Sequence, residues 1–478
     1  MRAPRLEPAG WLLLAAYAVA GLATLTSAHG WGDDWAQYVL HARNIVTGTP
    51  YGDTGYIFNP DAPYVGPPEY PPGLPLLLAP AIALFGVDIA ALKAVCFLCF
   101  VAMLPIAYAV LARFFGKAPA FAAVVLFGLH EQVWTLRQLI GSEAPYLLFS
   151  MAALWHASRE RSGSAAGAGA ISGVLVYASI ACRSIGLALV PALLLDAWLR
   201  RKPVSWYAAF LASFLLLVAA QNSLLVAPPT YAGELVLPGL QLIATNVRGY
   251  WDVARDLVPM PLGVLSHAAL AAVTAAAIVG ARAARGTPLP VWYLLAYLGV
   301  LAVVSISPGP RYLLPIMPIA LALAASGVAH LARRTAHPRR TIAACAAALA
   351  VYYAGLFACA RELREDELAT CAACGELYAF LREHTPAGSV IAFAKPRALA
   401  LFAERPGWIW NPDYDESTFR AKLRERARYL VIAAPGTLLR ERYPAYVDAR
   451  FERDIGTRAF SNAMFTVVEL RFQFLHPR

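Results

Sequence analysis

Apolar runs of membrane-spanning length recur along the first three quarters of the chain. A span needs about twenty mostly apolar residues, and runs near that length lie at about 11–29, 89–112, 117–133, 143–157, 165–182, 184–199, 204–225, 262–281, 289–307, 311–331 and 340–359. The pattern predicts an all-α polytopic membrane protein with about eleven transmembrane helices. The run at 11–29 follows a basic start, but similar runs recur, so we expect a retained signal anchor.

The pattern changes near residue 361, where charged residues become frequent and the apolar runs shorten to strand length. A helical pattern at Glu376–His384 precedes short apolar runs typical of strands, which lie at Ser389–Ala394, Arg428–Ala434 and Phe465–Phe472. We therefore expect two domains. Residues 1–360 form the membrane domain, with a first outer loop at 30–88, and residues 361–478 form a small α/β domain.

Composition agrees with this division. Hydrophobic residues make up 59% of the 478 positions and charged residues 15%, which excludes an ordinary soluble protein. The formal net charge is +10, but most basic residues sit in short connections between apolar runs. This arrangement indicates cytoplasmic loops of a membrane protein and no nucleic-acid partner.

The basic connections also determine the expected topology. If Pro71–Phe85 crossed the membrane, the cluster at Arg113 and Lys117 and all later clusters would lie outside. The run is short and contains four prolines, which interrupt helix hydrogen bonding, so we expect a re-entrant or interfacial helix. The amino terminus is then inside and the 361–478 domain outside a bacterial-type cytoplasmic (inner) membrane.

Two adjacent carboxylates, Asp33 and Asp34, follow the first span, where charge is costly and therefore indicates function. Residues 34–47 fit an amphipathic interfacial helix in which Asp34, Tyr38 and His41 share one side. Asp33 has the alternative role of capping that helix. Asp34 lies inside the first turn, where a cap does not explain it.

Remote polar residues fall on the same predicted outer side. They are Asp33, Asp34, Glu69, Glu143, Arg183, the loop at 226–261 and the segment Ser307–Tyr312. Each taken singly is explained by a solvated helix end. Their common sidedness favours one outer cavity.

The first outer loop resembles that of the GT-C superfamily of membrane glycosyltransferases. Trp31, Asp34, Tyr38 and Arg43 have the spacing found in aminoarabinose transferases and related protein O-mannosyltransferases. The resemblance implies that Asp34 is the catalytic aspartate. A second acid often follows directly in such relatives, and here that position is Trp35, which leaves a catalytic role for Asp33 open.

Later segments extend the resemblance over residues 1–335. GPPEYPP resembles a loop in which Glu69 matches a glutamate associated in some relatives with a metal, and Tyr70 stands where a phosphate-contacting lysine is frequent. SEAPYLLF makes Glu143 the second acid, and the segments around Arg183 and Arg311 are also similar to recurring family segments.

The resemblance implies a sugar transferase that uses a polyprenyl-phosphate donor and a lipid, glycan or protein acceptor. We expect inversion, with Asp34 as general base, and Asp33 and Glu143 as further catalytic acids. Arginine binds phosphate through a planar fork, so donor-phosphate candidates are Arg311, Tyr312, Arg183 and Tyr70. Substrate-binding candidates are Tyr38, His41, Arg43 and Arg248.

Several alternatives stay open at this point. Arg183 starts a span and has the alternative role of snorkelling to the interface. A divalent metal at Glu69, with His41 or His267 as a further ligand, is the one cofactor considered. Cys371 and Cys374 are candidates for a local disulfide.

A polytopic transporter or flippase of lipid-linked sugars is the alternative function, and a glycan polymerase or ligase is a third. A transporter is typically marked by midplane polar residues and repeat symmetry, whereas the ionisable residues here cluster at one membrane face. The chain also contacts membrane lipids under every one of these hypotheses.

Overall fold

The computed structural model describes residues 6–32, 34–62, 65–159, 164–225, 240–260, 263–284, 288–304, 309–358 and 363–471. These residues divide into two compact units. The first unit comprises residues 1–25, 93–224 and 231–360, and the second comprises residues 26–92, 225–230 and 361–478. The contacts of the first outer loop therefore group it with the carboxyl-terminal residues.

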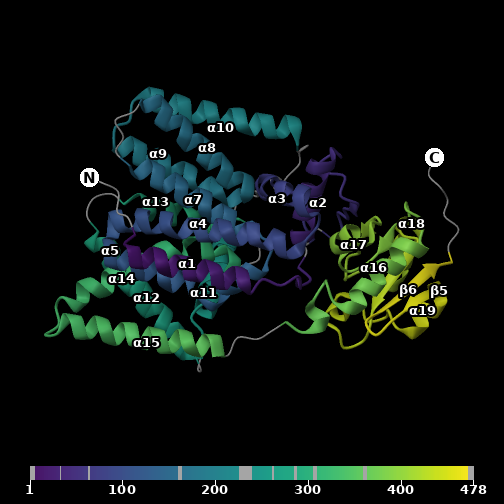
Figure 1. The fold of residues 1–478 in the computed structure, drawn as a ribbon. Helices are drawn as coiled ribbons and strands as arrows, with labels where there is room; N and C mark the ends of the chain where they lie inside the picture. The colour runs from purple at the N-terminus through teal and green to yellow at the C-terminus, as the bar shows by residue number, and fades with distance from the viewer. Residues whose placement is uncertain are drawn as a thin grey trace. The chain divides into compact units, whose positions relative to one another are not determined.

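The first unit is a bundle of helices (Figure 1). Its helices are α1 (Pro8–Ala23), α4 (Ile89–Phe115), α5 (Lys117–Gly128), α6 (Glu131–Thr135), α7 (Glu143–Ser158), α8 (Ala165–Cys182), α9 (Leu189–Leu199), α10 (Val204–Leu224), α11 (Leu240–Asp256), α12 (Gly263–Ala283), α13 (Leu289–Val303), α14 (Met317–Ala332) and α15 (Pro338–Ala358). The first four residues of α4 belong to the second unit.

A helix lies at every one of the eleven predicted spans. Among the described residues, six helical segments are long and apolar enough to cross a membrane: α4, α8, α10, α12, the segment Pro310–Ala332 that contains α14, and α15. The apolar helices α1, α5, α9 and α13 are shorter. Helix α1 ends six residues before the predicted limit, because polar residues follow Ala23.

Glycines allow two pairs of helices to approach closely. A Cβ atom on Gly169 or Gly173 of α8 would overlap the carbonyl groups of Trp206 and Phe210 in α10. Gly280 of α12 and Gly327 of α14 have the same relation to backbone carbonyls of the facing helix. Small residues at helix contacts are the usual means of association in membranes, where apolar side chains gain little by leaving lipid.

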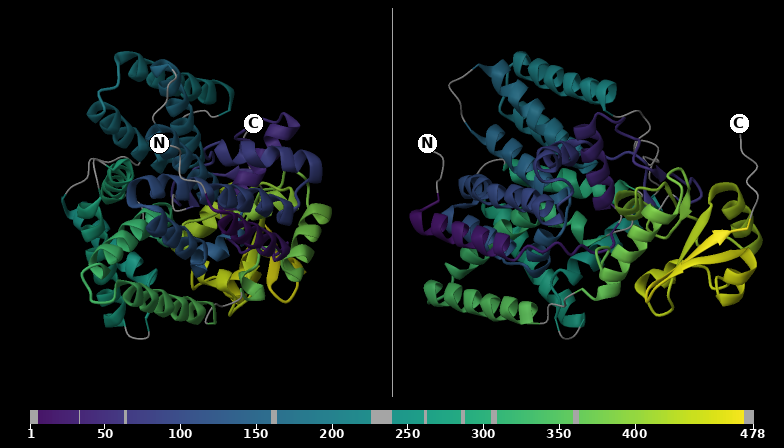
Figure 2. Two further views of the ribbon diagram at one scale, coloured as in Figure 1. Left: turned by 60° about the vertical axis from the view of Figure 1, so that its left-hand side comes forward. Right: turned by 45° about the vertical axis from the view of Figure 1, so that its right-hand side comes forward.

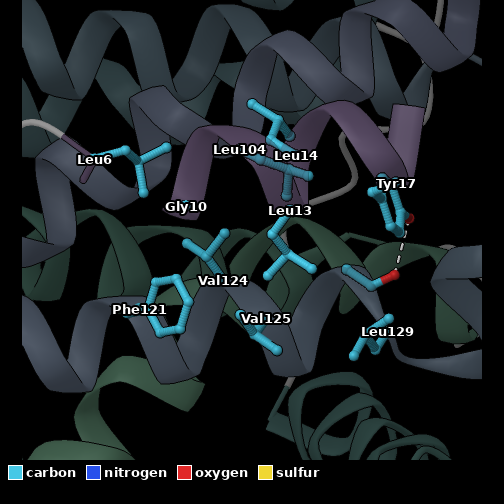
Figure 3. Close-up of a pocket in the computed structure, with 11 residues that line it drawn as sticks. Leu6, Gly10, Leu13, Leu14, Tyr17, Leu104, Phe121, Val124, Val125 and Leu129 are labelled. Carbon is cyan, nitrogen blue, oxygen red and sulfur yellow. Dashed lines mark hydrogen bonds between the residues drawn. The ribbon is translucent and has the colours of Figure 1, made fainter. Parts of the chain in front are cut away.

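An apolar pocket lies among α1, α4 and α5 in the first unit. Figure 3 shows Leu13 of α1 and Val124 of α5 facing this pocket, and its lining is almost entirely carbon. At one end, the Tyr17 hydroxyl donates a hydrogen bond to the Gly128 carbonyl over 2.8 Å. This contact satisfies a polar group that would be costly to bury unpaired.

The second unit combines helices with a sheet, whose strands β5 and β6 are drawn in yellow in Figure 2. Its helices are α2 (Asp34–Thr47), α3 (Gly73–Phe85), α16 (Ala372–His384), α17 (Pro396–Ala403), α18 (Glu416–Arg426) and α19 (Ala449–Ile455). Its strands are β1 (Tyr56–Ile57), β2 (Ile391–Ala392), β3 (Gly407–Trp408), β4 (Tyr429–Ala433), β5 (Gly456–Ser461) and β6 (Phe465–Leu470).

The strand order is β1-β3-β2-β4-β6-β5. The first four strands in this order are parallel, and β6 pairs antiparallel with both β4 and β5. Strands β2, β4 and β6 lie inside the three predicted runs, and α16 contains the predicted helix. Strand β1 comes from the first outer loop, with Tyr56 opposite Gly407 of β3, so this loop completes the sheet.

The start of α16 carries the predicted cysteine pair. Cys371 and Cys374 form a disulfide bond. The residues just before it, from Asp366 to Leu368, hold the segment in front of α2: the Trp31 indole donates to the Asp366 carbonyl over 2.9 Å, and Gly30 bridges to Leu368. The start of α2 is therefore anchored to the carboxyl-terminal residues.

Candidate active site

Asp34 begins α2 and lies in a hydrogen-bonded group within the second unit. Its Oδ1 atom accepts a hydrogen bond from the Tyr70 hydroxyl over 2.8 Å. The Asp34 side chain is 34% exposed, so the carboxylate is held on one side and open to solvent on another. The adjacent Asp33 lies outside the described residues, and its predicted catalytic role stays a prediction.

Arg397 of α17 forms the other half of this group. Its Nη1 atom donates to the Tyr70 hydroxyl over 2.6 Å and lies 3.9 Å from Asp34 Oδ1. Its Nη2 atom donates to the carbonyls of Gly66 and Pro67 over 3.1 and 2.9 Å. The Arg397 side chain is fully buried. A buried guanidinium needs such acceptors, because desolvating an unpaired charge is strongly unfavourable.

Two tyrosine rings enclose the Arg397 guanidinium. The guanidinium carbon lies 4.6 Å from the Tyr56 ring centroid and 4.7 Å from that of Tyr70, which allows cation–π attraction. By resemblance, Tyr70 stands where a lysine is frequent, so no positive charge was expected at this position. The structure brings a cation to the Tyr70 hydroxyl from a part of the chain remote in sequence.

Helix α2 differs from the prediction in its surroundings. It spans 34–47 as predicted, but nine of its residues are buried, among them the polar Gln37, His41 and Asn44. Helix α2 packs against α3 and α17 in the second unit. Protein therefore covers more of the helix than its sequence indicated, and its place at the membrane interface stays a prediction.

His41 is fully buried and both of its ring nitrogens have backbone partners. Nε2 lies 3.2 Å from the backbone nitrogen of Tyr70, and Nδ1 lies 2.8 Å from the Tyr51 carbonyl. Because an amide can only donate and a carbonyl can only accept, His41 is neutral with its proton on Nδ1. Burial lowers the pKa of His41 to about 4, aided by the nearby Arg397 charge. His41 thus holds the loop in place.

The other predicted substrate residues on α2 are Tyr38 and Arg43. Tyr38 is 6% exposed, and its ring packs against that of Tyr70 with centroids 5.1 Å apart. Arg43 is half-buried on the same helix. The structure therefore brings Asp34, Tyr38 and Tyr70 together, and their predicted roles toward a substrate stay predictions.

Glu69 lies beside the Tyr51 end of the same loop. Its carboxylate packs against Gly52, where a Cβ atom would overlap Oε1, and its charge helps burial to raise the pKa of Tyr51. Within the described residues, no three His, Cys, Asp or Glu side chains come together in a way that could hold a metal ion. His41 uses both nitrogens elsewhere, and His267 Nδ1 accepts from the Trp251 indole over 3.2 Å. A metal at Glu69 therefore stays a prediction.

A second group of charges lies in the first unit, where Glu143 bridges two arginines. Glu143 Oε1 is 2.6 Å from Arg183 Nη1 and 2.8 Å from Arg311 Nε. The Glu143 and Arg183 side chains are 8% and 9% exposed, whereas that of Arg311 is 42% exposed. The ion pairs therefore connect a buried carboxylate and a buried guanidinium to a second guanidinium, that of Arg311, which reaches solvent.

The neighbours of this cluster fix its geometry. Arg183 also donates to the Ser142 hydroxyl over 3.2 Å, and its guanidinium lies 5.4 Å from the Tyr312 ring centroid. The Tyr312 carbonyl accepts from the Tyr297 hydroxyl over 2.8 Å. Arg183 is thus buried in an ion pair, which does not agree with a snorkelling side chain. Arg248 is exposed on α11 and forms no ion pair with a described residue.

The sequence predictions therefore gather into two groups, one in each unit. Glu143, Arg183, Arg311 and Tyr312 lie together in the first, and Asp34, Tyr38 and Tyr70 lie together in the second. The predicted cavity common to all of them stays a prediction. Arg397 was missed, although a lone arginine in the apolar run AFAKPRALALF was a signal that a buried acceptor must exist.

The comparisons with known proteins agree on one fold. A family model described as dolichyl-phosphate-mannose-protein mannosyltransferase matches residues 69–229. The crystal structure of ArnT from Cupriavidus metallidurans bound to undecaprenyl phosphate is similar over 99% of this chain and 100% of its own, with 14% identity and a TM-score of 0.56. The protein has the fold of a GT-C glycosyltransferase.

An oligosaccharyltransferase from Archaeoglobus fulgidus has the same GT-C fold. Its structure with a tethered acceptor peptide is similar over 88% of this chain and 69% of its own, with 13% identity and a TM-score of 0.54. None of the curated proteins matches the chain. The predicted resemblance to the GT-C superfamily is confirmed, and the apolar helices with this fold make the chain a multi-pass membrane protein.

Proposed function

We propose that the protein is a membrane glycosyltransferase that moves a sugar from a polyprenyl-phosphate donor to a hydroxyl of a lipid, glycan or protein acceptor. One observation carries the proposal: Asp34 is held by Tyr70 and Arg397, yet remains one third exposed on a GT-C fold. The structure of ArnT was determined with undecaprenyl phosphate, which supports a lipid-linked donor.

In this proposal Asp34 acts as the general base. The acceptor oxygen attacks the anomeric carbon while the bond from that carbon to the phosphate oxygen breaks, so the configuration inverts. The acceptor proton passes to Asp34, and the phosphate leaves with the bonding electrons. A positioned base typically contributes about a hundred- to ten-thousand-fold. The hydrogen bond from the Tyr70 hydroxyl to Oδ1 orients the Asp34 carboxylate.

Arg311 is the proposed contact for the leaving phosphate. Its side chain is 42% exposed and its Nε atom lies 2.8 Å from Glu143, so Glu143 orients a guanidinium that groups from outside the protein can reach. Arginine binds phosphate oxygens through paired donors. Glu143 is then a positioning residue, because its Oε1 atom holds both arginines. Tyr312 and Arg183 support the same cluster.

A metal is given no step in this mechanism. One structure of an A. fulgidus oligosaccharyltransferase, a protein with a similar fold, contains Zn and sulfate. Among the described residues, Glu69 is not part of a group of three or more potential metal ligands. For localisation we propose the cytoplasmic membrane with the carboxyl-terminal residues outside, as the basic connections predict.

The test compares wild type with Asp34→Asn in lipid vesicles. The vesicles receive a panel of radiolabelled polyprenyl-phosphate sugars and a crude envelope extract as acceptor, and the measurement is sugar released from the donor. Asp53→Asn is the matched control, since Asp53 is exposed in the same loop. We expect a loss of at least a hundredfold for Asp34→Asn and none for Asp53→Asn.

Other results would redirect the proposal. Equal turnover of Asp34→Asn and wild type would show that Asp34 is not the general base. Movement of intact donor across the vesicle membrane without release of sugar would support the alternative, a transporter or flippase of lipid-linked sugars.

A further inference from the structure

A polar pocket lies at the end of the first unit's bundle that is remote from Glu143. Helix α7 runs from Glu143 to this pocket, and His156 lies about 20 Å along that helix at 1.5 Å per residue. The pocket is formed where α7 and α9 end and where α8 and α10 begin. Its polar lining residues are His156, Arg159, Ser172, Asp196 and Lys202.

Positive charges outnumber negative ones among the described residues that line the pocket. Asp196 is the acidic residue of its lining, and Arg200 already pairs with it through an Nε–Oδ2 distance of 2.8 Å. Arg159 and Lys202 form no ion pair with a described residue, and both are half-buried. The Arg159 guanidinium lies over the Trp155 ring, 4.4 Å from its centroid, which holds this cation near the pocket.

The N-termini of two helices add partial positive charge to the pocket. Ala165 and Ala168 from the first turn of α8, and Trp206 from the first turn of α10, line the pocket. The first backbone N–H groups of a helix lack intrahelical acceptors and carry partial positive charge. In α8 the Ser164 hydroxyl accepts from the Gly167 N–H over 3.0 Å, which leaves other amides of that turn without an intrahelical partner.

The position of the pocket matches a lipid headgroup. Helices α8 and α10 are long and apolar enough to cross a membrane, so their ends lie at the level of the headgroups. Arg159 and Lys202, which belong to two of the basic connections predicted to be cytoplasmic, both line the pocket. Basic pockets between helices on that side are suited to anionic lipid headgroups.

We infer that this pocket binds the phosphate group of an anionic phospholipid. Arg159 and Lys202 meet the phosphate oxygens, and the amide groups at the start of α8 and α10 lie behind them. The alanines, Leu193 and Trp206 offer an apolar wall to the glycerol and the first carbons of the acyl chains. The inference is independent of the proposed transferase activity.

The test uses the full-length protein in a neutral detergent with dioctanoyl phosphatidylglycerol as the probe. Native mass spectrometry and the shift of the unfolding temperature report binding. Dioctanoyl phosphatidylcholine tests the need for net negative charge, and inorganic phosphate tests whether the lipid is needed. We expect phosphatidylglycerol to bind at least tenfold more tightly than either, because two charge-assisted contacts and an apolar wall act together.

Two variants place the binding in this pocket. Arg159→Gln with Lys202→Gln removes the charges, and Ala165→Leu fills the space while keeping them. We expect each to weaken phosphatidylglycerol binding about tenfold. The control, Arg282→Gln with Arg333→Gln, removes two exposed charges from the same predicted side and should bind like wild type.

Three results would overturn the inference. Equal weakening in the control would indicate a diffuse surface effect. Unchanged binding by Ala165→Leu would place the lipid elsewhere. An equal effect of inorganic phosphate would show that the lipid is not the ligand.

Discussion

Replacing Arg397 by Met tests whether the carboxyl-terminal residues hold the candidate base. Methionine has a similar length and packs well in apolar surroundings, but it has no donor. The change removes the hydrogen bonds to Tyr70, Gly66 and Pro67 and the charge 3.9 Å from Asp34. Two backbone carbonyls and one hydroxyl lose a partner in a buried place.

The expected loss can be estimated from these contacts. Removing one partner of a buried ion pair costs about 3–5 kcal/mol. Because Asp34 is one third exposed, water partly replaces the missing charge, and we expect about 3 kcal/mol, the lower end of that range. In a domain of 150–250 residues this corresponds to a drop of roughly 6–12 °C in the unfolding temperature.

Thermal unfolding in detergent, followed by tryptophan fluorescence, measures this drop. Hydrogen exchange read by mass spectrometry measures the local effect. The segment 65–72 has four exchangeable amides, at Val65, Gly66, Glu69 and Tyr70, and these should exchange faster in Arg397→Met. The control is Arg450→Met, because the Arg450 side chain is 85% exposed and its distance to Asp454 is 3.9 Å. An unchanged midpoint together with unchanged exchange at 65–72 would refute the positioning role of Arg397.

Three further predictions concern other parts of the molecule. Glu143→Gln removes the carboxylate 2.6 Å from the buried Arg183 and should cost about 3 kcal/mol of unfolding free energy. Arg311→Gln should cost less because Arg311 is 42% exposed; equal unfolding temperatures of the two variants would contradict this. Below its ordinary pKa of about 6.5, His41 gains a proton on unfolding but stays neutral when folded down to its pKa of about 4. Stability should therefore fall by roughly 3 kcal/mol as pH drops from 6.5 to 4, and His41→Gln should flatten that slope. Gly280→Leu should destabilise the bundle because α14 backbone occupies the space, whereas Gly299→Leu meets open space; similar unfolding temperatures would contradict this packing.

The helices could be predicted because their physical cause is local. A run of about twenty apolar residues needs neither a partner nor a register to be recognised, and a helix lies at each expected span. Strands β4 and β6 also carry apolar runs of their own. Strands β1 and β3 are two residues long and leave no pattern, since their existence depends on partners that lie far away in the sequence.

The surroundings of α2 were also not predictable, because they depend on partners remote in the sequence. Its sequence shows polar and apolar positions at helical spacing, which predicted a helix with one wet side. Residues of the first outer loop cover the polar side. Gln37 and Asn44 are buried there, and their amide groups bond to the Pro68 carbonyl and to loop carbonyls including that of Asp53. A polar residue marks a need for hydrogen bonds, and protein can meet that need as well as water.

The sequence around Arg397 indicates that this side chain has partners, but not which residues they are. An arginine in an apolar run cannot be buried without acceptors, so the sequence requires that a remote segment supply them. It does not say which segment, because Gly66, Pro67 and Tyr70 lie about 330 positions earlier. Two of these acceptors are backbone carbonyls, which have no sequence signature at all. The identity of the partner is thus a property of the fold, whereas the existence of a partner is a property of the sequence.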